Sequence, residues 1–241
     1  MKDKPPISVL IKNFNKIYSN KPIFTDINLK VYDGEFVCII GPNGCGKSTI
    51  LNGIAGLIDY KGAITKISSN MGLVGQNTAE MLLPWFTVKS NIMFPGDKDN
   101  VDHNLFTALL EITKLNEYED KYPYQLSGGM RQLLLIARAL LNKSDIILLD
   151  EPFKSLDFEM AKKMQQKVLE LWSIYKPTII MVSHDIDESI FMADKVIIFS
   201  EKPTLIKKTV KINLPRPRSI NLLATDEFRE LKQEVLNVFL S

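Results

Sequence analysis

One nine-residue segment restricts the fold of this chain more than any other. Residues 41–49 match the spacing G-x-x-x-x-G-K-[ST], after an apolar run at 35–40 and before a helical pattern that starts at about Lys47. Glycines allow a tight turn that points backbone N–H groups at phosphate oxygens, and a helix start adds its positive dipole end. The segment therefore predicts a strand, a phosphate-binding loop and a helix; a glycine-rich turn that only caps the helix is the alternative. The residues predicted to contact the phosphates are Gly41, Pro42, Asn43, Gly44, Cys45, Gly46, Lys47, Ser48 and Thr49.

The rest of the chain alternates short apolar runs, rich in β-branched residues, with longer segments of helical period. This pattern is typical of a parallel sheet flanked by helices, and the near-continuous apolarity of the runs indicates strands buried on both faces. The predicted central strands cover residues 35–40, 71–74, 145–149, 178–182 and 195–199.

Further segments complete the predicted architecture. Residues 7–12 and 27–32 have the pattern of strands in a more exposed antiparallel sheet, whereas about 84–141 is mostly helical and interrupts the alternation. A last amphipathic helix is predicted at about 225–240. We therefore predict one α/β domain over 1–241: a P-loop NTPase core with a mainly parallel sheet, an N-terminal antiparallel β subdomain and an inserted α-helical subdomain.

The charges of the chain nearly balance, with 30 Lys and Arg against 28 Asp and Glu. No block of like charges could grip a phosphate backbone, which disfavours a nucleic-acid partner. The two cysteines, Cys38 and Cys45, cannot build a disulfide framework, and no apolar run approaches the ~18 residues that a membrane span needs. We expect a cytoplasmic chain that another protein would have to hold at a membrane.

Two carboxylates end the apolar run at 145–149 and suit different tasks. Asp150 is predicted to bind Mg²⁺ together with the Ser48 hydroxyl, while Lys47 reaches the β- and γ-phosphates. Glu151 could orient the water that attacks the γ-phosphate or accept its proton. Alone, an acidic end of a strand is ordinary; its weight comes from sharing a chain with the phosphate loop.

A second glycine pair lies 80 residues beyond Lys47. Ser127 precedes Gly128 and Gly129 at the start of an apolar helical run, so Ser127 is a natural N-cap and the glycines leave backbone N–H groups accessible. A capped helix is the plain interpretation, but together with the phosphate loop the pattern predicts a second anion site. A simple kinase has no use for such a site.

With these motifs, the chain resembles the ATP-binding subunit of an ABC transporter over essentially its whole length. Five segments match that family in order: Tyr18, Gln76, the signature at 126–130, the D-loop at 155–157 and His184 within 183–185. The resemblance implies that Tyr18 stacks on adenine, that Gln76 binds Mg²⁺ and takes part in catalysis with His184, and that the cofactors are ATP and Mg²⁺.

Within the family, the chain is most similar to the nitrate, sulfonate and taurine importer group. The similarity rests on the segment 81–91, on Met130 in the signature and on the tail from 214 to 231. Two residues depart from the pattern, since Lys154 stands where relatives often have Gly and Leu133 replaces a commonly basic residue.

The resemblance implies a peripheral protein on the cytoplasmic face of the cell membrane. Two copies would pair head to tail, so that Ser127, Gly128 and Gly129 of one copy close the nucleotide site of the other. Integral membrane permease subunits and, indirectly, an extracytoplasmic solute-binding protein are the other implied partners. An ABC ATPase that drives a membrane remodelling complex is the alternative, and a P-loop kinase is a further one; the long heptad insertion of DNA clamps is absent between the two glycine motifs.

Overall fold

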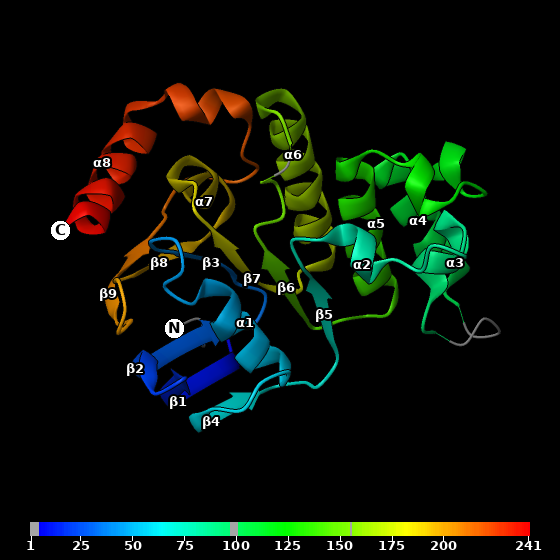
Figure 1. Cartoon of the computed structure of the whole chain (residues 1–241). Coiled ribbons are helices and arrows are strands. Elements are labelled where there is room, and N and C mark those ends of the chain that lie inside the picture. The colour runs from blue at the N-terminus through cyan, green and yellow to red at the C-terminus, as the bar shows by residue number, and fades with distance from the viewer. Residues whose placement is uncertain (1–4, 97–100, 155) are drawn as a thin grey trace. The chain divides into compact units, whose positions relative to one another are not determined.

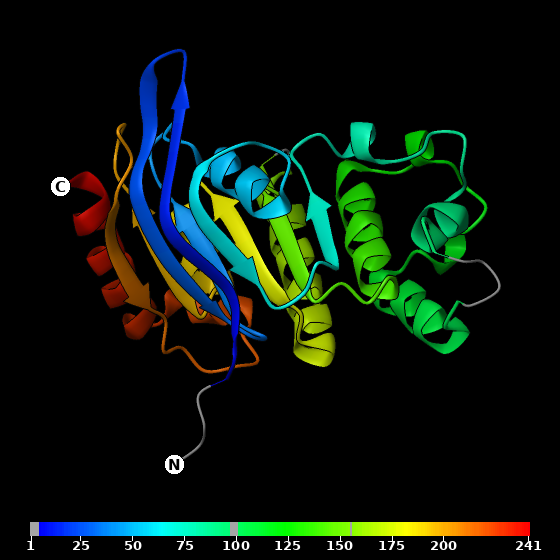
Figure 2. The ribbon, with the colours of Figure 1, turned by 90° about the horizontal axis from the view of Figure 1, so that it is seen from below.

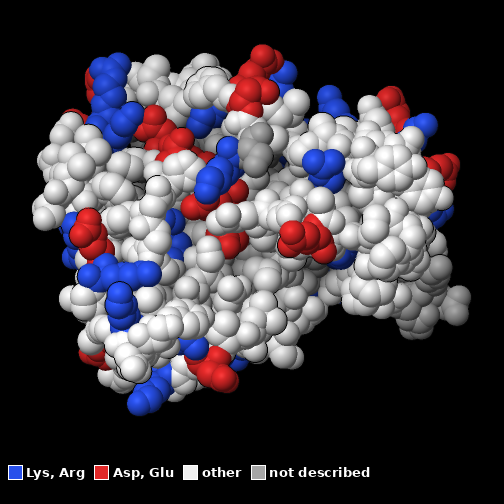
Figure 3. Space-filling view, in the orientation of Figure 1, with Lys and Arg blue, Asp and Glu red and all other residues white. Residues whose placement is uncertain are grey.

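The computed structural model describes residues 5–96, 101–154 and 156–241, and the chain divides into two compact units (Figure 1). The first unit joins Met1–Ser69 to Pro177–Ser241, and the second covers Asn70–Lys176. Among the residues described, none of the helices combines the length and the apolarity that crossing a bilayer requires. Positive and negative side chains are interspersed on the face drawn in Figure 3.

The first unit contains a three-stranded antiparallel sheet in the order β2-β1-β4. Its strands are β1 (Ile7–Tyr18), β2 (Lys21–Tyr32) and β4 (Lys61–Lys66). Ser19 and Asn20 have φ of 47° and 63°, which closes β1 and β2 into a tight hairpin, seen in Figure 2 as one long ribbon. Both strands extend beyond the predicted 7–12 and 27–32, because register shifts between Ile11 and Ile17 interrupt the alternation by which a strand is recognised.

A second sheet of the first unit is built on three parallel strands, with β3 in the middle. They are β3 (Phe36–Ile40), β7 (Thr178–Ser183) and β8 (Lys195–Phe199); β9 (Ile206–Lys211) adds to β8 in antiparallel fashion. Every residue of β3, β7 and β8 is buried, as their continuous apolar runs predict.

Four helices described in the first unit pack on this sheet or on each other. The helix α1 (Lys47–Ala55) contacts β7, and α7 (Ile186–Met192) packs on β3, β7 and β8. A short helix, η4 (Ile220–Ala224), leads into α8 (Asp226–Leu240), which lies against α7, β8 and β9 (Figure 1). Phe228 and Val235, seven residues apart on α8, are its buried residues, so the helix docks by one face.

The second unit is mostly helical around two parallel strands, β5 (Met71–Val74) and β6 (Ile146–Asp150). Its central helix α5 (Gly128–Leu141) is buried along most of its length and contacts all the longer helices and β5. The other helices are α2 (Thr78–Met81), α3 (Val88–Met93), α4 (His103–Thr113), η2 (Asn116–Tyr118), η3 (Pro123–Gln125) and α6 (Phe158–Tyr175). An antiparallel sheet, mainly parallel further strands and a helical unit confirm the predicted fold class.

Candidate nucleotide-binding site

The phosphate loop connects β3 to α1 in the first unit. Gly46 has φ of 112°, and a Cβ added there would lie 2.7 Å from the Phe24 ring, so both the conformation and the packing require glycine. Gly46 is also the N-cap of α1, with no side-chain cap bond and no acidic residue in the first turn. The N-terminus of α1 therefore offers its backbone N–H groups, and the positive end of the helix dipole, to an anion.

Lys47, the first residue of α1, is buried and folds back over the loop. Its Nζ donates to the carbonyl oxygens of Gly41 (2.8 Å) and Pro42 (3.1 Å). Because an ammonium carries three donors, these two bonds fix the side chain and leave a third donor for a phosphate oxygen. Ser48 is the second residue of α1.

Cys45 contributes its backbone to this loop. Burial raises the pKa of its thiol, against the opposing effect of Lys47, so the side chain is a neutral packing group near neutral pH. Its carbonyl oxygen accepts a 2.6 Å bond from the hydroxyl of Thr204, which is fully buried before β9. Thr204 was not predicted, since 159 residues separate it from Cys45 and no local pattern marks it.

Two further predicted residues of the first unit lie at the ends of strands. His184 is exposed between β7 and the N-cap of α7, Asp185, whose backbone N–H donates to Ser183 Oγ at 3.0 Å. Tyr18 is the last residue of β1 and is nearly half exposed.

The second unit brings Gln76 and Asp150 together. Because β5 and β6 are parallel neighbours with Val74 opposite Leu149, the residues that follow these positions lie at one edge of the pair. Gln76 Nε2 lies 3.4 Å from Asp150 Oδ1. The carboxylate and the amide carbonyl of this pair are oxygen donors, the class that Mg²⁺ prefers, so these residues fit the predicted metal role.

Glu151 has a left-handed backbone, with φ of 45°, directly after β6. Its side chain is 8% exposed and its Oε2 lies 2.6 Å from Nζ of Lys154, which is 54% exposed. The bond to Glu151 raises the pKa of Lys154. Lys154, noted above as a departure from the family pattern, therefore forms an ion pair with the predicted general base.

Ser127 caps α5 and accepts a bond from the Met130 N–H at 3.3 Å, as its position predicts. Ser127 is exposed, and a Cβ added to Gly129 would lie 3.2 Å from two atoms of Met164 on α6. A surface groove of about 890 Å³ adjoins Ser127 and includes Leu133. Leu133 is buried in the core, which accounts for an apolar side chain at a position that is commonly basic in the family.

Each unit thus assembles a share of the predicted site. The phosphate loop, Tyr18 and His184 belong to the first unit, whereas Gln76, the carboxylates and the signature belong to the second. Of the predicted D-loop, Ser155 lies outside the described residues, and Asp157 caps α6 by accepting from Met160 N–H at 2.9 Å.

Comparison with known proteins gives matches over most of the chain. A family model described as ABC transporter matches residues 24–154. The sequence is 39% identical to the aliphatic sulfonates import ATP-binding protein SsuB of Bacillus cereus, over 97% of this chain and 94% of that protein.

Solved structures are also similar in fold, and two examples show how far the likeness extends. A dimeric ATP-binding cassette in a post-hydrolysis state, bound to ADP and Pi, superposes with a TM-score of 0.70 and 26% identity, over 86% of this chain and 100% of that one. The cbiO1 protein from Clostridium perfringens, part of the complex cbiONQ, gives a TM-score of 0.76 at 21% identity over 98% of both chains, which shows the fold alone.

Proposed function

The chain belongs to the ABC transporter family and is an ATP-binding ATPase, and from this premise we propose that it powers an importer for a small anion. The observation that carries the proposal is the presence in one chain of two helix starts, at α1 and at α5, that have no acidic residue in their first turn and are therefore suited to an anion. One grips the phosphates directly, while the other, around exposed Ser127, is offered to the nucleotide of a second copy.

The phosphate loop binds the triphosphate of ATP in this proposal. The N–H groups of residues 41–49 surround the β-phosphate, and the third donor of Lys47 reaches toward the γ-phosphate. Tyr18 stacks on the adenine ring. The phosphate loop thus binds the charged triphosphate, and the Tyr18 ring binds the adenine base.

Ser48, Gln76 and Asp150 are the residues that would hold Mg²⁺. The 3.4 Å contact between Gln76 and Asp150 supports this, because it gathers oxygen donors at one edge of the strand pair. When bound, Mg²⁺ supplies charge neutralisation at the β- and γ-phosphates.

Hydrolysis uses the carboxylate that follows Asp150. Water attacks the γ-phosphorus, its proton passes to Glu151, and the bond to the β–γ bridging oxygen breaks, leaving ADP and phosphate. His184 and Lys47 stabilise the charge that develops on the equatorial oxygens. The buried position of Glu151 supports this role, since it limits the orientations of the carboxylate.

ATP joins two copies head to tail, and hydrolysis releases them. Ser127, Gly128 and Gly129 of each copy face the γ-phosphate bound by the other, so neither site is complete alone. The dimeric cassette with ADP and Pi supports this arrangement. Because ATP binds the paired state more tightly than a single copy, it shifts the equilibrium toward the pair.

Membrane permease subunits bind this dimer and change conformation when it closes. The second unit offers an aromatic surface for them: Trp85 is 68% exposed, stacks edge-on with Phe86, and Phe86 contacts Phe94. Few charged side chains lie over α3 in Figure 3. The similarity to the Bacillus cereus protein favours an aliphatic sulfonate as the solute, delivered by an extracytoplasmic binding protein, with the chain on the cytoplasmic face of the membrane.

Glu151→Gln tests the proposal. We expect at least a ~100-fold loss of turnover with ATP still bound, because the general base is lost, and a stable dimer in ATP and Mg²⁺ by size-exclusion chromatography with light scattering. Glu159→Gln is the matched control, since Glu159 also pairs with a lysine, Lys163, at 2.5 Å but lies exposed on α6. Near-normal turnover, or a monomer with ATP and Mg²⁺ present, contradicts the proposal.

A further inference from the structure

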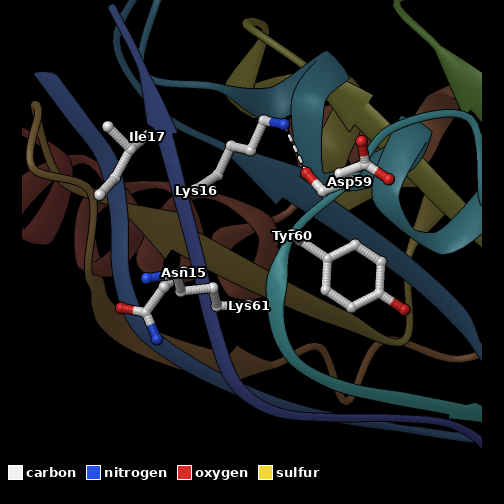
Figure 4. Close-up of a pocket in the computed structure, with 6 residues that line it drawn as sticks. All are labelled: Asn15, Lys16, Ile17, Asp59, Tyr60 and Lys61. Carbon is white, nitrogen blue, oxygen red and sulfur yellow. Dashed lines mark hydrogen bonds between the residues drawn. The ribbon is translucent and has the colours of Figure 1, made fainter. Parts of the chain in front are cut away.

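Lys16 connects the predicted adenine-stacking residue to the segment that follows α1. Lys16 and Tyr18 are two positions apart near the end of β1. The Nζ atom of Lys16 lies 4.6 Å from the centroid of the Tyr18 ring, within the range of a cation–π contact. It also donates to the backbone carbonyl of Asp59, as Figure 4 shows.

The carbonyl that receives this bond is itself held in place. Tyr60, the next residue, packs against the buried Phe14 ring with centroids 5.0 Å apart, and Lys61 pairs with Asn15 in the β1–β4 ladder. Lys16, Asp59, Tyr60 and Lys61 are among the residues that line an open hollow of about 230 Å³ (Figure 4). The ammonium is therefore anchored at a fixed point instead of moving freely in solvent.

The consequence for Tyr18 is a choice of ring face. Its side chain is 46% exposed at the end of a strand, where an aromatic ring would otherwise sample several rotamers. A cation on one face limits that sampling and leaves the opposite face for a planar ligand. Ordering a side chain before binding lowers the cost of binding.

We propose that Lys16 is a positioning residue for ATP, which acts by holding the Tyr18 ring for the purine base. The inference rests on the proposed function, because it requires that Tyr18 stack on adenine. The inference goes beyond the proposed function because it assigns part of the affinity for the base to a residue that does not touch the nucleotide. Affinity for the phosphates is a separate contribution.

Isothermal titration of the full chain, with Mg²⁺ withheld to prevent turnover, separates the two contributions. Lys16→Met should weaken ATP binding roughly two- to fivefold, the size of an exposed cation–π contact. Its affinity for inorganic tripolyphosphate, which has no base, should not change. Lys16→Arg should restore ATP affinity, and Lys61→Met, which removes a lysine that lines the same hollow, should match the wild type.

A Tyr18→Ala background identifies which idea is at fault. If Tyr18→Ala leaves ATP affinity unchanged, the adenine-stacking role in the proposed function is wrong. If Tyr18→Ala weakens ATP but Lys16→Met does not, or if Lys16→Met weakens tripolyphosphate equally, the inference about Lys16 is overturned. Adding Lys16→Met to Tyr18→Ala should have no further effect. If Lys16→Met folds poorly, Lys16→Gln replaces it. Urea unfolding then serves as the check on folding, and the variant is used if its midpoint equals that of the wild type.

Discussion

Cys38 lies in β3, at the centre of the parallel sheet of the first unit, with its Sγ 3.1 Å from Ser189 Oγ. Burial raises the pKa of this thiol far above its usual range, although the bond to Ser189 opposes the shift. The unfolded thiol ionises near pH ~8.5, so above that pH the unfolded state loses a proton that the folded state keeps. The contribution to stability is complete at neutral pH and is lost as the pH rises.

The pH dependence of unfolding should therefore change when this thiol is removed. Between pH 9 and 10, the free energy of unfolding of the wild type should fall by about 1.2 kcal/mol more than that of Cys38→Ala. Urea titrations at several pH values measure the two slopes. Because lysines and tyrosines titrate in both proteins, only the difference counts, and parallel slopes contradict the prediction.

The site residues differ in how far the sequence could reveal them. The positive φ of Gly46 and the bonds from Lys47 to Gly41 and Pro42 involve only neighbours in the chain, so spacing predicts them, whereas the packing of Gly46 against Phe24 does not follow from spacing. Thr204, which holds the Cys45 carbonyl, and the Lys16 contact with Asp59 join residues far apart in sequence. The roles of Glu151 and His184 remain predictions, since they concern a ligand and a reaction.

At the scale of elements, one buried guanidinium fixes the end of α7. Arg218, 7% exposed, donates from Nη1 to the carbonyls of Ile190 (3.1 Å), Phe191 (3.0 Å) and Ala193 (2.7 Å). Burial lowers its pKa to about 10, so it stays charged at neutral pH. These are carbonyls that a helix end leaves without partners.

Arg218→Met should destabilise the chain by about 1–3 kcal/mol, because it leaves buried carbonyls without a donor while keeping much of the side-chain volume. Chemical denaturation at pH 7 measures the loss. Arg229→Met is the control: its guanidinium pairs with Asp226 at 2.8 Å but is 67% exposed, so its removal should cost less than ~1 kcal/mol. Equal losses in both variants would show that burial of Arg218 adds nothing.

Three of the predicted central strands are uniformly buried, whereas β5, predicted equally well at 71–74, is only partly buried, so the prediction of burial on both faces was wrong for that strand. The runs at 35–40, 178–182 and 195–199 became β3, β7 and β8, because a strand buried on both faces needs unbroken apolarity. No strand was predicted for β4 or β9. Both are exposed along most of their length and rich in lysine, a composition that protects sheet edges but hides the strand from a hydrophobicity pattern.

The whole molecule, in the proposed mechanism, is a half-site. The phosphate loop and Glu151 serve the nucleotide of their own copy, whereas the helix start at Ser127 serves that of the partner. A defect in Ser127 and a defect in Glu151 therefore damage different sites of a dimer. Two inactive variants should complement each other when they pair head to tail.

Mixing tests this arrangement directly. Ser127→Arg and Glu151→Gln are each expected to be nearly inactive, but a mixed dimer carries one intact site, formed by Glu151 of the first variant and Ser127 of the second. Equal amounts give half mixed dimers, so turnover should recover to about a quarter of the wild-type value. The variants are combined before ATP is added, because ATP would trap Glu151→Gln in dimers with itself.

The complementation separates a shared site from a self-contained one. The control is a mixture of Ser127→Arg with Glu159→Gln, a variant whose nucleotide sites are expected to be intact. This mixture gives the turnover expected when one partner of the dimer is normal. Turnover of the test mixture should also rise with total protein concentration, since pairing is bimolecular. No recovery above the sum of the separate variants, with both shown to bind ATP, means that each copy completes its own pocket and that α5 has another role.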